Sequence, residues 1–428
     1  MSLSRPIFES SPSATPAEAG AQRTSANLHE AMMDSVSSVR DSLPEQHRAH
    51  FETLRQEIID FTKVHGISRE SLGKPDLLRE ATCKLSTPDL ERLADLLKRF
   101  EYLLKNGEPK KEDYTEALEY GEKFYRLKEQ YDFQVSLLEQ VGILKEGALL
   151  GIDGKKYPIP TLEQIASRLF ERHEELSTKH DQGFTKLLLV PFGMSLDVLQ
   201  EVLKQFLLDY KKKNPDFDLD TDNPLYTSEE YQGADDGDFP KLVYYPQSFD
   251  KKNHQGKTKI QILEKQEDNQ DFFPGWTIHL LQPSNQGTQD TKTPQGFAFI
   301  PRKGQGISEG DFIPRLPLQA GKTEEEYLSI LKDAKEDKGS PYHHESSLTP
   351  EDWIMAFMLH LEETGRPLDN AYNHVFTESV SYLAGAFFRS SILVPYAYWS
   401  HDFRKILLNT HAPHSRNWNT GLRSSVIV

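Results

Sequence analysis

The stretch between residues 216 and 238 carries carboxylates at the spacing found in calcium-binding loops. Four acidic residues occupy such positions: Asp218, Asp220, Asp222 and Glu229. Oxygen ligands at these intervals can surround a hard cation. The sixth position of the loop, where the sharp turn needs glycine, is Asn223, so the alternative is a solvated acidic loop held open by charge repulsion. Calcium is therefore the one cofactor that the sequence leaves open, and no other is expected.

Histidines suggest a second kind of metal site. Three of the fifteen histidines lie between residues 401 and 414: His401, His411 and His414. They lack the His-Glu-x-x-His spacing that places two imidazoles on one face of a helix. The chain also lacks a Gly-x-Ser-x-Gly motif, and its one cysteine, Cys83, is remote in sequence from this segment. A metal-dependent enzyme using the acidic stretch 216–238 or the histidine segment 401–414 is thus the alternative function, and a non-catalytic protein is favoured.

Composition narrows the classes of partner. The 428 residues include 66 acidic and 50 basic side chains, for a net charge of −16. Such a charge argues against a nucleic-acid or anionic-membrane partner. The sequence shows neither a run of eighteen apolar residues nor the pattern of a signal peptide, so we expect no membrane span. The expected location is the cytoplasm, with non-classical export left open, and a lone cysteine forms no intramolecular disulfide.

Three regions follow one another along the chain. Residues 1–25 are rich in Ser, Pro and Ala and predict a disordered leader. Residues 26–145 carry apolar residues at three- and four-residue spacing, which predicts a helical bundle or hairpin that could mediate homo-oligomerisation. One long helix is expected from Lys111 to Val141. Residues 146–428 combine long loops with short apolar runs of strand length, such as 186–190. They also contain a helix that is capped by Thr349 and Pro350 and ended by Gly365. The expected fold class is therefore α+β.

The segment from Asn370 to Val428 differs from the rest of the acidic chain. It contains five basic residues, two acidic residues and ten aromatic residues. We expect four of the aromatic residues to be core, because they flank apolar neighbours: Phe387, Phe388, Tyr398 and Trp399. The positions between His401 and Asn419 show no clear periodicity. Aromatic, Arg, Ser and Asn side chains are typical of adaptable recognition surfaces, because rings give contact area at a low entropic cost.

A family resemblance rests on five segments. The ending Gly-Leu-Arg-Ser-Ser-Val at 421–426 resembles the closing strand of C-type-lectin-like domains of the formylglycine-generating-enzyme type. Variable proteins of diversity-generating retroelements also carry that fold, and their C-terminal residues are rewritten between copies. Segments 383–388 and 394–399 are similar to the scaffold of uncharacterised bacterial proteins with such an ending, which share 186–194 and 349–353 as well. The enzymes of this fold use cysteine, which residues 146–428 lack, so oxidase activity is not implied.

This resemblance implies a binding protein that displays a diversifiable surface at residues 389–420 to a protein or glycan ligand. The implied scaffold residues are Gly385, Pro395, Trp399, Gly421 and Arg423. The implied ligand-facing residues are Ser400, His401, Phe403, Arg404, His411, His414, Arg416, Asn417 and Trp418. No catalytic residue is implied.

Overall fold

The computed structural model describes residues 43, 45–72, 75–106, 114–237, 239–267, 272–285, 293–371 and 380–428. The predicted leader, residues 1–25, lies outside these ranges. The chain forms two compact units, residues 1–113 and residues 114–428. None of the helices in the described ranges combines the length and apolar character needed to cross a bilayer.

The described part of the first unit consists of helices joined by short turns. Its helices are α3 (Glu45–Val64), α4 (Arg69–Leu72), α5 (Pro75–Thr82) and α6 (Thr87–Asn106). Helices α3 and α6 pack against each other, and the rings of Phe51 and Phe100 lie 5.1 Å apart in their shared core. Leu54 and Ile58 extend this core along α3, as the three- and four-residue spacing of apolar residues predicts.

Helices α7 (Thr115–Tyr125) and α8 (Leu127–Gln140) belong to the second unit, although the sequence suggested that the helical region continues to residue 145. They separate at Arg126, which adopts a left-handed conformation with φ of 51°. Their apolar faces join the core of the second unit through contacts of α7 with α9 (Leu162–Glu171). Periodicity shows which face of a helix is apolar but not which element covers it, so the boundary could not be placed from the pattern alone.

A four-stranded antiparallel sheet forms the centre of the second unit, in the order β3-β6-β14-β7. Its strands are β3 (Lys186–Val190), β6 (Thr277–Leu281), β7 (Glu345–Ser347) and β14 (Ser424–Ile427). Helix α14 (Pro350–Thr364) packs against β3 and is almost wholly buried. Thr349 caps this helix through a capping box with Asp352, and Gly365 ends it in a left-handed conformation, as the sequence predicted.

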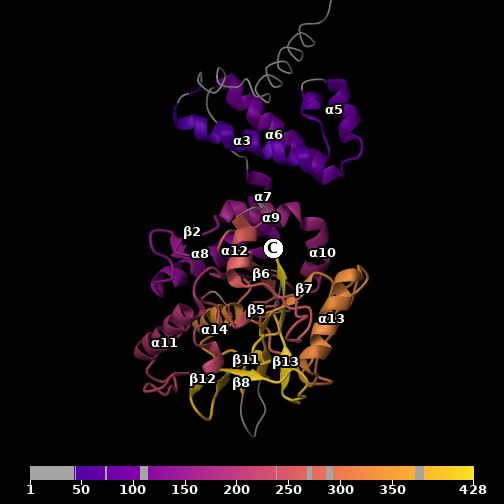
Figure 1. Ribbon diagram of the computed structural model, residues 1–428. Helices are drawn as coiled ribbons and strands as arrows, with labels where there is room; N and C mark the ends of the chain where they lie inside the picture. The colour runs from indigo at the N-terminus through magenta and orange to yellow at the C-terminus, as the bar shows by residue number, and fades with distance from the viewer. Residues whose placement is uncertain are drawn as a thin grey trace, which may run out of the picture. The chain divides into compact units, whose positions relative to one another are not determined.

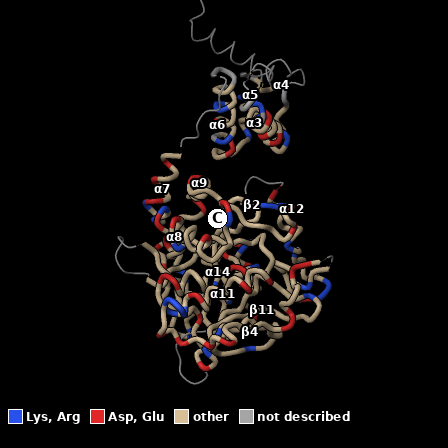
Figure 2. The backbone as a smooth tube through the Cα atoms, turned by 90° about the vertical axis from the view of Figure 1, so that its left-hand side faces the viewer, with Lys and Arg blue, Asp and Glu red and all other residues tan. Residues whose placement is uncertain are grey.

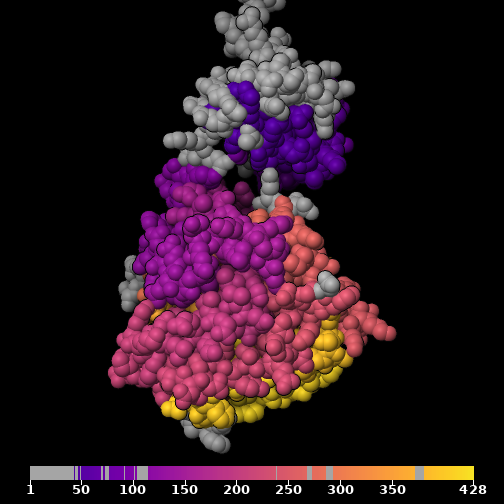
Figure 3. Space-filling model, turned by 60° about the vertical axis from the view of Figure 1, so that its left-hand side comes forward, coloured from indigo at the N-terminus to yellow at the C-terminus, as the bar shows by residue number. Residues whose placement is uncertain are grey.

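A six-stranded sheet lies at the end of the second unit away from α9 and α12 (Figure 1). Its strands are β4 (Leu225–Thr227), β8 (Asn370–Ala371), β9 (Val380–Tyr382), β11 (Val394–Ser400), β12 (Lys405–His411) and β13 (Thr420–Leu422). Strand β11 is central, with β12 antiparallel on one side and β8 and β9 on the other. Much of the segment 380–422 therefore lies at one end of this unit, where yellow atoms gather in Figure 3, whereas β14 returns to the central sheet.

The remaining elements complete the unit around these sheets. The strands form two short antiparallel pairs: β1 (Ala148–Leu150) with β2 (Lys156–Pro158), and β5 (Leu242–Tyr244) with β10 (Ala386–Phe388). The helices are α10 (His173–Asp181), α11 (Leu196–Lys213), η1 (Glu229–Tyr231), α12 (Lys259–Glu267) and α13 (Glu324–Glu336). Helices and antiparallel strands thus share one core, which is an α+β architecture. Acidic and basic residues are both distributed over its backbone (Figure 2).

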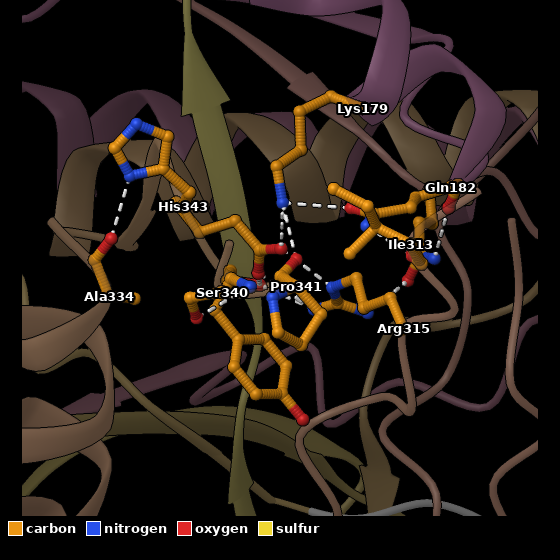
Figure 4. A network of polar contacts seen from close by, with 12 residues as sticks. Lys179, Gln182, Ile313, Arg315, Ala334, Ser340, Pro341 and His343 are labelled. Carbon is orange, nitrogen blue, oxygen red and sulfur yellow. Dashed lines mark hydrogen bonds and ion pairs between the residues drawn. The ribbon is translucent and has the colours of Figure 1, made fainter. Parts of the chain in front are cut away.

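Buried ion pairs join elements that are distant in sequence. Lys179 on α10 donates to Glu345 on β7 at 2.8 Å, and Arg315 donates to both oxygens of that carboxylate at 2.6 and 2.8 Å (Figure 4). Arg315 also donates to the Ser424 hydroxyl on β14 at 3.0 Å. Burial would raise the pKa of Glu345, but Arg315 and Lys179 hold it below its ordinary value. These contacts fix a loop and a helix onto two strands of the central sheet.

Candidate functional site

Strand β11 separates the core of the second unit from a surface rich in tyrosine. Ala397 and Trp399 point inward and belong to the main hydrophobic core. Tyr396 and Tyr398 alternate with them and are half-buried on the opposite face. Their ring planes are within 8° of parallel, and the ring centroids lie 6.1 Å apart. Tyr398 is therefore a surface residue rather than the core residue that its apolar neighbours suggested.

Strand β12 returns antiparallel to β11 after a tight turn at residues 401–404. Arg404 adopts a left-handed conformation in this turn, with φ of 53°, and the amide of Phe403 donates to the Ser400 hydroxyl at 3.3 Å. The Phe403 ring is 57% exposed. Ile406 and Leu408 on β12 are buried in the core, so the aliphatic residues of this segment form the inner face of a strand.

A cavity of about 210 Å³ opens on the outer face of β11, and we call it the tyrosine cavity. Its lining residues are Ala371, Val380, Tyr382, Tyr396, Tyr398, Ser400, Phe403, His411, Asn417, Asn419 and Thr420. Four of these belong to the ligand-facing set expected from the sequence: Ser400, Phe403, His411 and Asn417. Strands distant in sequence therefore bring part of that set together around one opening. Residues 372–379, which connect two lining residues, lie outside the described ranges.

Three consecutive glutamates at the start of α13 hold the rim of the cavity, and we call them the glutamate clamp: Glu324, Glu325 and Glu326. Glu324 Oε1 lies 3.1 Å from His411 Nδ1, Glu325 Oε2 lies 2.9 Å from His414 Nδ1, and Glu326 Oε1 lies 2.5 Å from Arg416. Thr323 caps this helix through a capping box with Glu326. These contacts anchor the end of β12 and the loop between β12 and β13 to α13. The anchored residues, His411, His414 and Arg416, all belong to the ligand-facing set expected from the sequence.

The hydrogen bonds of His411 define its tautomer. Asn417 Nδ2 lies 3.2 Å from His411 Nε2 and donates to it, so the ring proton is on Nδ1 and is donated to Glu324. Burial lowers the pKa of His411 and raises the pKa of Glu324 to about 8. At neutral pH the Asn417–His411–Glu324 chain is therefore mostly uncharged.

The five residues assigned to the scaffold are buried: Gly385, Pro395, Trp399, Gly421 and Arg423. A Cβ atom at Gly385 would lie 2.5 Å from the carbonyl oxygen of Ser347, so only glycine fits there. Arg423 donates to Asp369 Oδ1 at 2.7 Å and to the carbonyl of Ala298. Asp369 also accepts from the Trp353 indole at 2.8 Å, and one carboxylate therefore joins α14 to the residue between β13 and β14.

The remaining ligand-facing residues of the sequence-based set lie outside the cavity lining. Trp418 is 63% exposed, and the Arg302 guanidinium lies 4.8 Å from the centre of its ring. His401 is half-buried in the turn after β11, and its amide donates to the carbonyl of Ala371 at 3.3 Å. Arg404 is directed toward Asp218 at 3.5 Å. The set therefore divides into residues that line the cavity, residues of its anchored rim and residues beyond it.

The acidic stretch is paired with the basic residues of β12. Asp218 meets Arg404, and Asp220 lies 2.8 Å from Lys405, which lowers the pKa of that aspartate. Asp222 is exposed and Glu229 opens η1. Within the described ranges, no group of three or more His, Cys, Asp or Glu side chains is arranged to hold a metal ion, either here or near His401, His411 and His414.

One further arrangement has the residue types of a nucleophilic triad. Ser425 Oγ lies 2.9 Å from His279 Nδ1, and His279 Nε2 lies 3.1 Å from Asp352 Oδ1. All three side chains are fully buried, and neither the tyrosine cavity nor the smaller cavity beside Arg423 is lined by them. A substrate has no access to this serine, so the arrangement joins β14, β6 and α14 within the core.

Several residues of the site were missed from the sequence. They are Tyr382, Tyr396, Tyr398, Asn419, Thr420 and Glu324. Tyr396 and Tyr398 alternate with Ala397 and Trp399, which is a period-2 signal for a strand with one polar face. Thr323 and Glu326 are spaced as a capping box, which marks the start of α13 and hence the position of Glu324. Tyr382 and Thr420 reach the cavity through the pairing of β9 with β13, for which the sequence offers no local signal.

Comparisons with known proteins add no relative: no family model, no curated protein and no solved structure matches the chain significantly. The α+β class is established by the arrangement of helices and strands alone. No comparison relates this fold to C-type-lectin-like domains.

Proposed function

We propose that this chain is a non-catalytic binding protein whose second unit presents the tyrosine cavity and its rim to a ligand. The arrangement would be that of a C-type-lectin-like domain, with the display surface at residues 389–420. The observation that carries the proposal is the convergence of Ser400, Phe403, His411 and Asn417 on one open cavity. All four belong to the ligand-facing set that the family resemblance implies.

The surroundings of the cavity support a recognition role. Aromatic side chains dominate binding hot spots because they bury a large area with few rotatable bonds. Phe403 and Trp418 are both more than half exposed near the opening, although rings of this size are usually buried. The strands beneath them are held by buried ion pairs, including Arg423 with Asp369. A rigid frame with exposed rings suits binding, since little entropy is lost when the partner arrives.

Screening the full chain on protein and glycan arrays tests this proposal, followed by affinity measurements with each ligand found. Phe403→Ala and Trp418→Ala should each weaken binding at least tenfold, as loss of an exposed hot-spot ring does. Tyr226→Ala is the matched control, because Tyr226 is an exposed aromatic residue on β4 of the same sheet and does not line the cavity. Unchanged affinity in both test variants, or equal loss in the control, would contradict the proposal.

The first unit would contribute assembly rather than recognition. We propose that it mediates association between copies of the chain, because its helices expose apolar residues such as Val64, which is 78% exposed. Sedimentation equilibrium of the full chain tests this part. A monomer at all concentrations would overturn it and would leave the binding role of the second unit untouched.

A further inference from the structure

We propose that the tyrosine cavity binds a neutral, hydroxyl-rich unit about the size of one sugar ring, as part of a glycan. This inference rests on the proposed binding function and specifies the chemistry of its ligand. It follows from the charge, the hydrogen-bonding groups and the ring surfaces that line the cavity.

The described residues of the lining offer no charged Lys, Arg, Asp or Glu side chain to a ligand. Of the lining residues, His411 has the ordinary pKa closest to neutral pH, and burial lowers the pKa of His411 further. Two basic side chains of β12 and the loop after it are paired with carboxylates, Arg416 with Glu326 and Lys405 with Asp220. Moving a charged group into such a cavity would remove its hydration without supplying a partner, so neutral ligands are favoured.

The lining instead offers groups that both donate and accept hydrogen bonds. Ser400 and Thr420 carry hydroxyls, and Asn417 and Asn419 carry amides. Tyr382 also lines the cavity, and its hydroxyl is buried and interacts with Thr420 without forming a hydrogen bond of good geometry among the described residues. A buried polar atom of this kind is costly unless a ligand or water satisfies it. Ligand hydroxyls, which donate and accept at the same atom, match this mixture of groups.

The aromatic residues of the lining provide surfaces that can contact the apolar face of a sugar ring. Tyr396 and Tyr398 present nearly parallel rings from one face of β11, with Phe403 at the end of the strand. A sugar ring has an apolar face of C–H groups that can lie against the negative face of an aromatic ring. The volume of about 210 Å³ is below the roughly 300–1,000 Å³ of cavities that hold drug-sized ligands. One sugar ring is therefore the unit that fits, with the rest of the glycan outside.

Neutral methyl glycosides of the common hexoses and N-acetylhexosamines are the probes for this proposal. Saturation-transfer NMR with the full chain detects contact, and the fluorescence of Trp418 gives the affinity, since that residue lies between Asn417 and Asn419. The other three tryptophans, Trp276, Trp353 and Trp399, are buried and serve as an internal reference. At least one glycoside should bind with a Kd of about 1 mM or below, which is ordinary for a single weakly held unit.

Two substitutions localise the binding. Tyr382→Phe removes only the buried hydroxyl and should weaken binding about fivefold to tenfold, the effect of one hydrogen bond. Tyr396→Ala should weaken it further by removing a ring. Tyr226→Ala should leave the Kd unchanged, and near-native circular dichroism and melting temperature identify variants that remain folded. Full affinity in both Tyr382→Phe and Tyr396→Ala would overturn the assignment of the sugar to this cavity.

Charged probes separate this inference from the proposed function. N-Acetylneuraminic acid and trimethyllysine should bind at least tenfold more weakly than the best neutral glycoside. Either charged probe could instead bind more tightly than the best neutral glycoside, with an affinity that Tyr382→Phe weakens. In that case the inferred ligand chemistry is wrong, while the proposed binding function stands. If no neutral glycoside binds at about 20 mM, the sugar inference is overturned, and the array screen then decides the proposed function by itself.

Discussion

His411 Nδ1 donates to Glu324 Oε1 at 3.1 Å, and this bond joins the end of β12 to the first residue of α13. The pair connects the outer sheet, which carries the tyrosine cavity, to a helix that the sequence analysis did not associate with it. Because both groups titrate away from their ordinary ranges, the attachment of the cavity rim should depend on pH.

The first prediction concerns Glu324. Its pKa rises from 4.5 to about 8 on folding, so its stabilising contribution is complete below pH 4.5 and is lost as the pH rises through 8. The pKa of His411 is lowered, so its contribution is lost in the opposite direction, as the pH falls below 6.5. Between pH 6.5 and 8, the unfolding free energy should therefore decrease with pH by an amount on the order of 2 kcal/mol owing to Glu324.

Urea unfolding followed by tryptophan fluorescence measures this change, because all four tryptophans lie in the second unit. Glu324→Gln keeps a neutral side chain at every pH and should flatten the profile between pH 6.5 and 8. Glu325→Gln is the control, because Glu325 is exposed and lies one residue along the same clamp. Parallel profiles for the native chain and Glu324→Gln would show that Glu324 is already ionised in the folded protein.

The second prediction concerns Gly385. Adding a Cβ atom there brings it to 2.5 Å from Ser347 O and 2.8 Å from Leu348 O, both in the backbone. Gly385→Ala should therefore reduce the unfolding free energy by about 1–3 kcal/mol or more, since backbone cannot move aside as a flexible side chain does. Gly339→Ala, where the nearest atom is an aspartate oxygen at 3.3 Å, should change stability by less than about 0.5 kcal/mol. Equal midpoints in urea would refute the assigned scaffold role.

The third prediction concerns Arg423. Arg423→Met leaves the buried carboxylate of Asp369 without its cation and should cost about 3–5 kcal/mol. Arg404→Ala removes an exposed pair with Asp218 and should cost no more than about 1 kcal/mol. Thermal unfolding of the two variants beside the native chain compares them. A small loss for Arg423→Met would mean that Asp369 is satisfied by Trp353 alone.

The fourth prediction concerns calcium. Because Asp218 and Asp220 already face Arg404 and Lys405, added calcium or a chelator should leave the melting temperature unchanged. A bound cation would instead raise the melting temperature with concentration, by mass action on the folded state. Such a rise, abolished in Asp222→Asn, would support the calcium site that the acidic spacing left open.

The fifth prediction concerns variation between copies of the gene in one source. If the surface is diversified, substitutions should fall on outward positions such as Tyr396, Tyr398 and Phe403. They should avoid Ile406 and Leu408, which are buried in the core. Sequencing several copies measures this directly. Substitutions spread evenly over inward and outward positions would remove the support for a diversified surface.

The sequence predicted elements whose signals are local. Thr349, Pro350 and Gly365 marked both ends of α14, and the apolar run at 186–190 marked β3. The separation of α7 from α8 was missed, because a left-handed Arg126 carries no compositional signal. The cavity was only partly predicted. Its Ser, Phe, His and Asn members were recognisable by residue type, whereas Tyr382 and Glu324 arrive through pairing and packing over long distances in the chain.

From Tyr396 to Trp399, strand β11 alternates a half-buried surface side chain with a core side chain, and this geometry restricts how its gene can change. A deletion or insertion of one codon within the strand would reverse the two sets and place Trp399 in solvent and tyrosines among aliphatic neighbours. Replacement of outward residues carries no such penalty. Evolution of this segment should therefore proceed through point changes at constant length, even in lineages where the neighbouring loops grow or shrink.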